Sequence, residues 1–410
     1  MRHAALFLAL IAALQAGRAE AQSPAQALAA RWNTICLTAV AGTLLATRCD
    51  ETANSTAPNA NLIAALGQRL NEIPGQARIA TRDTAGSSLG LSLPNIGGQA
   101  VAAEFRQNYD GSLSMQLDSE IASHWSIFVS GDIGRLDRRA GPNEAAFSAD
   151  TSSLTAGVDW QPNDRWNVGF ALNHVRESLD YDGTAGAVDT RFSGALITAG
   201  RTLGQHWSVN AYAGWLQGDY ELQREIRYSL PFAFGTFTIE GMAVANPDAA
   251  RRVYGVSANG QWSYKGWNPS FAIGMDGGRT HIDGYDETGG VGLNLRVPAR
   301  DIDTRRGRVD FGISRAFSQN WGVWQPMARV SWFNEFSNPR RQVTLRLALD
   351  NARNGVTFNP EDPDTGWGEI AIGSVFVFTH GHSGFIQYQQ RFAHSFLQER
   401  MLALGWRMEL

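Results

Sequence analysis

Length, composition and charge exclude several classes of protein. The chain has 410 residues, is 43% hydrophobic and carries a net charge of −4, and its mean hydropathy is −0.24. This charge argues against a nucleic-acid-binding surface. Because no apolar run of about 18 residues occurs beyond the N-terminal region, membrane-spanning helices are not expected either.

Residues 1–21 are typical of a signal peptide. A weakly basic start precedes the apolar stretch 4–16, which is too short to span a membrane as an anchor. Ala19-Glu20-Ala21 has the small-x-small pattern of a cleavage site. We therefore expect an exported protein whose mature chain begins at Gln22.

Residues 22–80 are predicted to form a small helical segment. Apolar residues recur at a spacing of three to four over 25–47, which predicts one helix. A similar spacing over 59–73 predicts a second helix, which Pro74-Gly75 would end.

Cys36 and Cys49 are the two cysteines of the chain. In an exported protein such a pair most simply forms one disulfide. A closed loop of this size would add roughly 3 kcal/mol of stability in the chain-entropy model. Two free thiols are the alternative, and the spacing is not the Cys-x-x-Cys of redox-active pairs.

Residues 81–123 are rich in glycine, serine and other small or polar residues, which indicates a linker, and one arrangement would thread it through a barrel. Gly86-Ser-Ser-Leu-Gly90 has the letters of a nucleophile elbow centred on Ser88. The strand and helix that an elbow requires are not readable around it, so a chance match is the simpler interpretation.

From residue 124 onward apolar and polar residues alternate with the period of a β-strand. Val168 and Phe170 share one face, and Asn167 and Gly169 share the other. The apolar face often ends in Trp or Tyr, which predicts strands with lipid outside, a wet lumen inside and aromatic side chains at the rims. Twelve strands are expected, over 125–138, 148–161, 166–180, 187–201, 207–225, 236–264, 267–285, 299–317, 321–336, 367–379, 383–394 and 399–410.

The joins between these strands alternate in length, as in outer-membrane barrels with short periplasmic turns and long extracellular loops. A soluble β-sandwich would explain the strands but not this second regularity. The tight turns are 162–165, 204–206, 265–266, 318–320 and 380–382, and the long joins are 139–147, 181–186, 226–235, 286–298 and 337–366.

The closing strand Leu402–Leu410 has one wholly apolar face. Such a strand would promote aggregation at the edge of a soluble sheet, whereas a closed barrel leaves no free edge. The fold class predicted is therefore all-β: a twelve-stranded antiparallel transmembrane barrel over 124–410, preceded by the helical segment.

Over residues 124–410 the sequence resembles the autotransporter family. The resemblance depends on Trp125-Ser-Ile-Phe-Val-Ser-Gly131, on Trp321-Gly-Val-Trp-Gln-Pro-Met-Ala-Arg-Val-Ser-Trp332 and on the closing strand. The closing strand is also similar to the family's barrel-assembly signal, through Gly405, Met408 and Leu410. Leu410 replaces the usual terminal Phe.

The resemblance implies a translocator barrel of type V secretion in the outer membrane of a Gram-negative bacterium, with a helix in its pore and an N-terminal passenger. It also implies outer-membrane lipid and lipopolysaccharide, the barrel-assembly machinery and periplasmic chaperones as partners. Typical passengers are long β-helices, whereas only residues 22–123 are available here and they show no strand repeat. The identity of any passenger stays open.

No catalytic set, cofactor site or metal site is predicted. His380 and His382 flank a glycine in a turn, and solvated histidines are the simpler interpretation than a metal site. The acidic run 361–364 lacks the spacing of a calcium loop. Arg308 and Asp310 lie on the expected inner face of a strand, where paired lumen charges are the structural interpretation and an ion-selective constriction is the alternative.

The sequence thus favours an outer-membrane barrel of the autotransporter type that anchors, and in addition translocates, a short disulfide-bearing segment. A plugged channel or porin, in which residues 22–120 gate the lumen, is the alternative. A surface enzyme would have only the match at Ser88 in its favour.

Overall fold

The computed structural model describes residues 24–54, 104–107, 113–116, 125–141, 144–163, 165–182, 186–337, 342–358, 364–378 and 381–410. The predicted signal peptide, the helix expected over 59–73 and most of the expected linker fall outside these ranges. Among the residues described, no helix is both long enough and apolar enough to cross a membrane.

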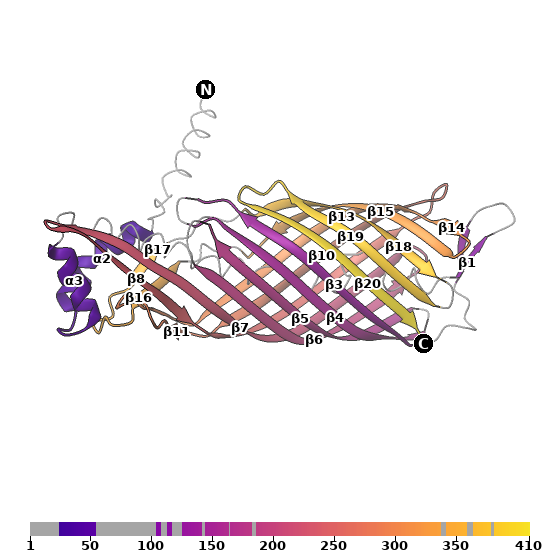
Figure 1. Cartoon of the computed structure of the whole chain (residues 1–410). Coiled ribbons are helices and arrows are strands. Elements are labelled where there is room, and N and C mark those ends of the chain that lie inside the picture. The colour runs from indigo at the N-terminus through magenta and orange to yellow at the C-terminus, as the bar shows by residue number, and fades with distance from the viewer. Residues whose placement is uncertain are drawn as a thin grey trace, which may run out of the picture.

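Twelve of the described strands form a closed antiparallel barrel, which confirms the predicted fold class. Each strand pairs with its neighbours in the chain, and the last strand closes the barrel against the first. The strands run obliquely along the barrel wall (Figure 1). In order around the barrel they are β3 (Trp125–Arg138), β4 (Phe147–Asn163), β5 (Trp166–Tyr181), β6 (Ala187–Leu203), β7 (Trp207–Phe232), β9 (Asp248–Gln261), β10 (Trp267–Ile282), β13 (Arg300–Arg315), β15 (Gly322–Glu335), β18 (Gly366–Phe378), β19 (His382–Phe392) and β20 (Leu397–Glu409).

The outer face of the barrel is apolar over a continuous band. Phe170 and Leu172 of β5 are exposed on this face, whereas Asn173, next in the chain, is buried on the inner face. At the end with the short turns, aromatic rings gather on neighbouring strands, as in the stacked pair Trp125 and Trp160, whose ring centroids lie 6.1 Å apart. This arrangement places an aromatic girdle at one membrane interface.

The short turns and the end of the barrel domain lie together. Lys265 and Gly266 have φ angles of 51° and 78°, which is the backbone of a two-residue hairpin turn between β9 and β10. At the same end, the Leu410 backbone N–H donates to the Trp125 carbonyl oxygen over 3.0 Å. The long joins are at the opposite end (Figure 1).

The prediction of one continuous strand over 236–264 is wrong, and so is the prediction of a loop over 226–235. The chain instead forms two strands, β8 (Gly235–Ala245) and β9, separated at Asn246-Pro247. β7 continues to Phe232, and β8 pairs with this extension as a hairpin that projects beyond the barrel, while an isolated bridge joins Val244 to Thr288. Pro247 has no N–H and ends the strand, while its carbonyl oxygen accepts a hydrogen bond from Tyr220 over 3.0 Å.

Two of the long joins contain strands that alternation did not predict. β11 (Tyr285–Asp286) and β12 (Leu295–Val297) lie in one join, and β16 (Val343–Leu347) and β17 (Val356–Phe358) lie in the other. Together they form a sheet of order β11-β12-β16-β17 at the loop end. Elsewhere, β14 (Phe317–Gln319) extends a tight turn, and the expected linker contains a hairpin of β1 (Glu104–Gln107) and β2 (Leu113–Gln116).

The inner face of the barrel is not polar throughout, which corrects the expected wet lumen. On β5, β6 and β7 it carries a buried apolar cluster that includes Val175, Phe192 and Leu216. Polar and charged residues such as Asp310 and Arg329 line the wall formed by β13 to β20. The larger apolar cluster thus lies on one side of the lumen, where Glu177 and Arg251 are also buried, and we call the wall of β13 to β20 the charged wall.

The N-terminal segment forms two helices where the spacing predicted one over 25–47. These are α2 (Pro24–Thr38) and α3 (Leu44–Asn54). The chain turns at Gly42, whose φ of +83° favours glycine. The Thr43 side-chain oxygen accepts the Ala46 N–H over 3.2 Å and so caps the start of α3.

Candidate functional site

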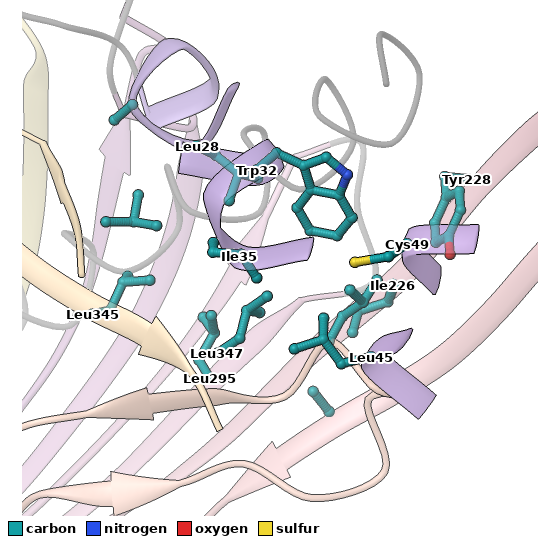
Figure 2. Close-up of a cluster of buried hydrophobic side chains, with 14 of the residues drawn as sticks. Leu28, Trp32, Ile35, Leu45, Cys49, Ile226, Tyr228, Leu295, Leu345 and Leu347 are labelled. Atoms are coloured by element: carbon teal, nitrogen blue, oxygen red, sulfur yellow. The ribbon is translucent and has the colours of Figure 1, made fainter. Parts of the chain in front are cut away.

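Helices α2 and α3 pack at the loop end of the barrel, against the projecting β7–β8 hairpin and the small sheet (Figure 2). We refer to α2, α3, the β7–β8 hairpin beyond the barrel and the sheet β11-β12-β16-β17 as the cap. The start of α3 lies against the same loops, because a Cβ added at Gly292 would come within 2.7 Å of the Leu44 Cβ. The cap thus joins the N-terminal segment 24–54 to residues between 226 and 358.

A single hydrophobic core holds the cap together. Leu28, Trp32 and Ile35 lie on one face of α2 and are at most 2% exposed. Leu45 of α3 is fully buried in the same cluster. Their partners in the barrel domain come from every strand of the cap; they include Ile226, Tyr228, Leu230, Ile239, Leu295, Val297, Leu345, Leu347, Val356 and Phe358.

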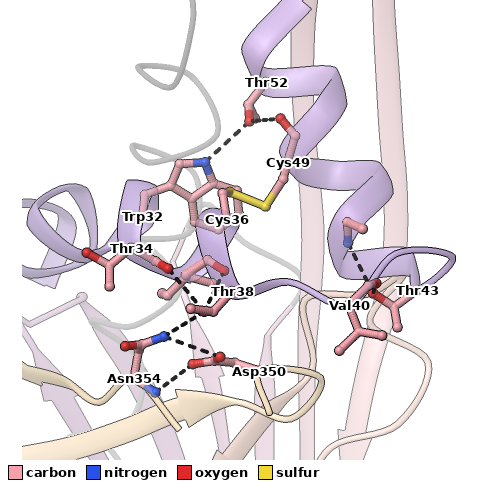
Figure 3. Close-up of a disulfide and its surroundings, with 12 residues drawn as sticks. Trp32, Thr34, Cys36, Thr38, Val40, Thr43, Cys49, Thr52, Asp350 and Asn354 are labelled. Carbon is pink, nitrogen blue, oxygen red and sulfur yellow. Dashed lines mark hydrogen bonds between the residues drawn. A yellow bond between two sulfur atoms is a disulfide. The ribbon is translucent and has the colours of Figure 1, made fainter. Parts of the chain in front are cut away.

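A disulfide between Cys36 and Cys49 joins the two helices (Figure 3). The bond has an S–S length of 2.08 Å and a Cα–Cα distance of 5.5 Å. Cys49 is 8% exposed and belongs to the core. The pairing agrees with the one expected from the sequence.

Hydrogen bonds fix the helices to each other and to the barrel loops (Figure 3). The Trp32 ring N–H donates to the Thr52 hydroxyl over 3.3 Å, and that hydroxyl donates to the Cys49 carbonyl over 2.8 Å. In the join before β17, the Asn354 amide donates to the Thr38 hydroxyl of α2 over 3.1 Å. This bond connects side chains that are 316 positions apart in the sequence.

A buried ion pair fixes the base of the hairpin. The Arg224 guanidinium binds both carboxylate oxygens of Glu287, at 2.9 Å for the Nε contact. Arg224 also donates to the Leu293 carbonyl over 3.0 Å, and Glu287 accepts the Leu295 N–H over 2.8 Å. Because both charges are buried and paired, loss of one partner would leave a buried charge uncompensated.

Two carboxyl groups of the cap have shifted pKa values, in opposite directions. Burial raises the pKa of Glu51 above its ordinary 4.5, against the opposing effect of Arg48, which lies 2.8 Å away. The hydrogen bond from Arg296 lowers the pKa of Asp286 below its ordinary 3.8. The charged form is therefore disfavoured at Glu51 and favoured at Asp286.

The predicted lumen pair lies on the charged wall. Arg308 Nε is 3.3 Å from Asp310 Oδ2, and both side chains are mostly buried. Two residues before Arg308, on the same inner face, Arg306 donates to Asp276 of β10 over 2.9 and 2.6 Å. This arrangement is that of paired structural charges, while an ion-selective constriction stays a prediction that these distances do not address.

The residues of the predicted assembly signal lie at the closing seam. Met408 is level with Ile127 of β3. A side chain at Gly405 would meet the Phe385 ring, so this position has a packing reason to be glycine. Their role in assembly stays a prediction.

The remaining sequence candidates do not form a site among the described residues. Ser88, His380 and most of the acidic run 361–364 fall outside them, and His382 lies 5.6 Å from Trp406, ring to ring. The described residues contain no group of three or more His, Cys, Asp and Glu side chains that could hold a metal ion. What sequence reasoning missed is the barrel-domain half of the cap, for which the alternation of Val343, Leu345 and Leu347 was the available signal.

Comparison with known proteins agrees with this fold. The family model described as autotransporter beta-domain matches residues 127–389, which is more than half of the chain. No curated protein matches the sequence.

Among solved structures, the translocator domain of the autotransporter NalP from Neisseria meningitidis is similar with a TM-score of 0.54 and 10% identity, over 70% of this chain and 89% of that one. The beta domain of the Bordetella autotransporter BrkA is similar with a TM-score of 0.51 and 17% identity, over 70% of this chain and 100% of that one. Translocator domains of this kind are generally not enzymes. The chain belongs to the autotransporter beta-domain family and is an outer-membrane β-barrel of a Gram-negative bacterium.

Proposed function

We propose that this barrel brings α2 and α3 to the cell surface and retains them there as a docked cap. The observation that supports this is the shared core, in which Trp32 and Leu45 of the helices are buried against Ile226 and Leu295 of the barrel's own loop end. Side chains that complete one hydrophobic core separate only at the cost of exposing it. The helices are thus anchored rather than released.

The orientation of the barrel supports a surface location for the cap. Outer-membrane barrels have short turns on the periplasmic side and long loops outside. The cap is built on the long joins between β7 and β9, between β10 and β13, and between β15 and β18. We infer that its task is display or binding at the surface, and that the chain has no catalytic role.

Cysteine labelling on intact cells tests this function. The pair Cys36–Cys49 is disulfide-bonded, so a new cysteine would be the single reactive thiol. Ala30→Cys places it on the exposed face of α2, and the matched control Gln205→Cys places it in an exposed short turn at the opposite end. We expect a membrane-impermeant maleimide to label Ala30→Cys on intact cells, and Gln205→Cys only after the outer membrane is permeabilised.

The reverse pattern for Ala30→Cys would contradict the proposal. Labelling only after permeabilisation would place the helices away from the cell surface and would favour the alternative, a plugged channel or porin whose N-terminal segment gates the lumen. That alternative has less support, because α2 and α3 pack on strands beyond the barrel wall and the family match is to a translocator.

A further inference from the structure

Arginines stand directly opposite one another on neighbouring strands at three places of the outer face. In each case the two residues are register partners and both side chains are exposed. The pairs are Arg135 and Arg400 on β3 and β20, Arg176 and Arg191 on β5 and β6, and Arg252 and Arg279 on β9 and β10.

Such pairs are unfavourable without an anion. Side chains directly opposite on antiparallel strands have Cβ atoms about 5 Å apart, and like charges there destabilise the sheet. One member of each pair has a carboxylate partner: Arg135 has Asp137, Arg191 has Glu221 and Arg279 has Asp303. Within the described part of the chain, the other members, Arg176, Arg252 and Arg400, lie within ion-pair distance of no carboxylate.

The three pairs occupy one level of the barrel. Each lies near the loop end of its strands, a few residues beyond the exposed apolar band. Arg252 is followed on the outer face by Tyr254 and Val256, and Arg279 is preceded by Met275 and Ile273. In an outer-membrane barrel this level is the headgroup layer of the outer leaflet.

The pair on β9 and β10 has a third arginine beside it. Arg305 of β13 is also exposed on this face, diagonal to Arg279, and Asp303 is the carboxylate bound to Arg279, at 2.7 and 3.1 Å. The nearby Asp301 and Asp283 are held by His281, at 2.8 and 3.2 Å. Three guanidinium groups therefore share this face with three carboxylates, and among the described residues the side chains of Arg252 and Arg305 form no ion pair with any of them.

We propose that Arg252, Arg279 and Arg305 bind a phosphate group of an outer-leaflet phosphorylated glycolipid, of which lipopolysaccharide is the expected source. The planar guanidinium offers paired N–H donors that match phosphate oxygens. The apolar side chains of Met275, Ile273 and Val256 lie just below this site, where they meet the acyl chains of the same molecule. Head and tail are thus recognised together, which a free phosphate cannot achieve. This site shares with the proposed function of the cap only the orientation of the barrel, with its loop end outside, and it does not require the cap to be docked.

The experiment compares three probes on the purified full-length barrel in detergent: bisphosphorylated lipid A, dephosphorylated lipid A and inorganic phosphate. We expect the Kd for bisphosphorylated lipid A to rise about tenfold in Arg252→Gln, as loss of a charge-assisted hydrogen bond predicts. The matched control is Arg201→Gln, an exposed arginine at the short-turn end that packs on Trp166, and its affinity should equal that of the parent.

Thermal unfolding without lipid gives a second readout, in which Arg252→Gln should not weaken the protein although it weakens lipid binding. Arg252→Gln relieves the like-charge repulsion, so its Tm in lipid-free detergent should be equal to or above the parent's, while the rise in Tm on adding lipid A should be smaller. Equal binding of the dephosphorylated lipid, equal binding of inorganic phosphate, or an equal loss in Arg201→Gln would each overturn the proposal. If Arg252→Gln does not fold, Arg305→Gln carries the same test.

Discussion

Single residues of the cap give it a dependence on pH whose sign follows from the two shifted pKa values. The raised pKa of Glu51 means that the folded cap binds more protons than the unfolded one above pH 4.5. The contribution of Glu51 to the stability of the cap is then fully present below the pKa that Glu51 has in the unfolded chain, and it is lost as pH rises through the pKa that Glu51 has in the folded cap. The lowered pKa of Asp286 affects the stability of the cap only below about pH 3.8, the ordinary pKa of an aspartate. In that range the stabilising contribution of Asp286 is lost as pH falls.

We therefore expect the resistance of the cap to protease to be greatest near pH 4.5 and to decline toward neutral pH. Glu51→Gln should flatten the decline above pH 4.5 and leave the loss below pH 3.8 unchanged, since the latter belongs to Asp286. Limited proteolysis of the purified barrel across this range is the measurement. A decline of parental size in the variant would show that another group is responsible.

The disulfide between Cys36 and Cys49 stabilises the helical part of the cap. Replacing both Cys36 and Cys49 by serine should lower the stability of the helical part of the cap by roughly 3 kcal/mol in the chain-entropy model. The expected result is faster proteolysis of 24–54, with an unchanged heat-modifiable mobility shift of the barrel. A barrel that itself lost its folded band would mean that the bond supports assembly and not only the cap.

At the scale of strands, the two faces of β5 predict unequal effects of the same substitution. Phe170 lies midway along the exposed apolar residues of β5, between Trp166 and His174. Phe170→Arg should impair assembly by about 2–4 kcal/mol, whereas Asn167→Arg on the inner face should be mild. The yield of folded barrel in outer-membrane fractions measures both, and equal yields would contradict the inward and outward assignment.

The closing strand β20 predicts a defect of assembly. Deleting 408–410 removes the pairing of Met408 with His382 and Ile127, and the backbone bond from Leu410 to Trp125. Lipid supplies no replacement for these hydrogen bonds. We expect the truncated chain to be exported but degraded, and Leu410→Phe to assemble at least as well as the parent. If the truncated chain gave a folded band of parental intensity, the barrel would close without residues 408–410.

The strands could be predicted where lipid imposes the pattern. Along β5 the apolar residues from Trp166 to Leu172 must alternate, because one face meets hydrocarbon and the other does not. Beyond the membrane this constraint ends, and the β7–β8 hairpin and the small sheet were missed for that reason. The spacing of Leu28, Trp32 and Ile35 indicated a buried helix face, but nothing local names partners such as Leu345, more than 300 positions away. The arginine pairs are likewise visible only once the register is known.

At the scale of the whole molecule, α2 and α3 are an addition to a barrel that closes without them. All twelve barrel strands find their partners among residues 125–410. Deleting 24–54 should therefore leave the barrel folded, with its heat-modifiable shift intact, while Ile226, Leu295 and their neighbours become exposed. Increased binding of a hydrophobic dye by the deleted form, relative to the full chain, is the expected signal. Loss of the folded barrel would show that the helices help it to assemble.

The shared core has a consequence for the direction of transport. The outer membrane offers no nucleotide hydrolysis to drive the helices outward, so a movement across it needs another source of bias. Burying side chains of this size yields about 1.5–3 kcal/mol each, and the matching surface exists only at the loop end. Once Trp32 and Leu45 have reached that surface, return requires that this free energy be given back. Docking of the cap would thus act as a ratchet, in which the product of transport prevents its own reversal.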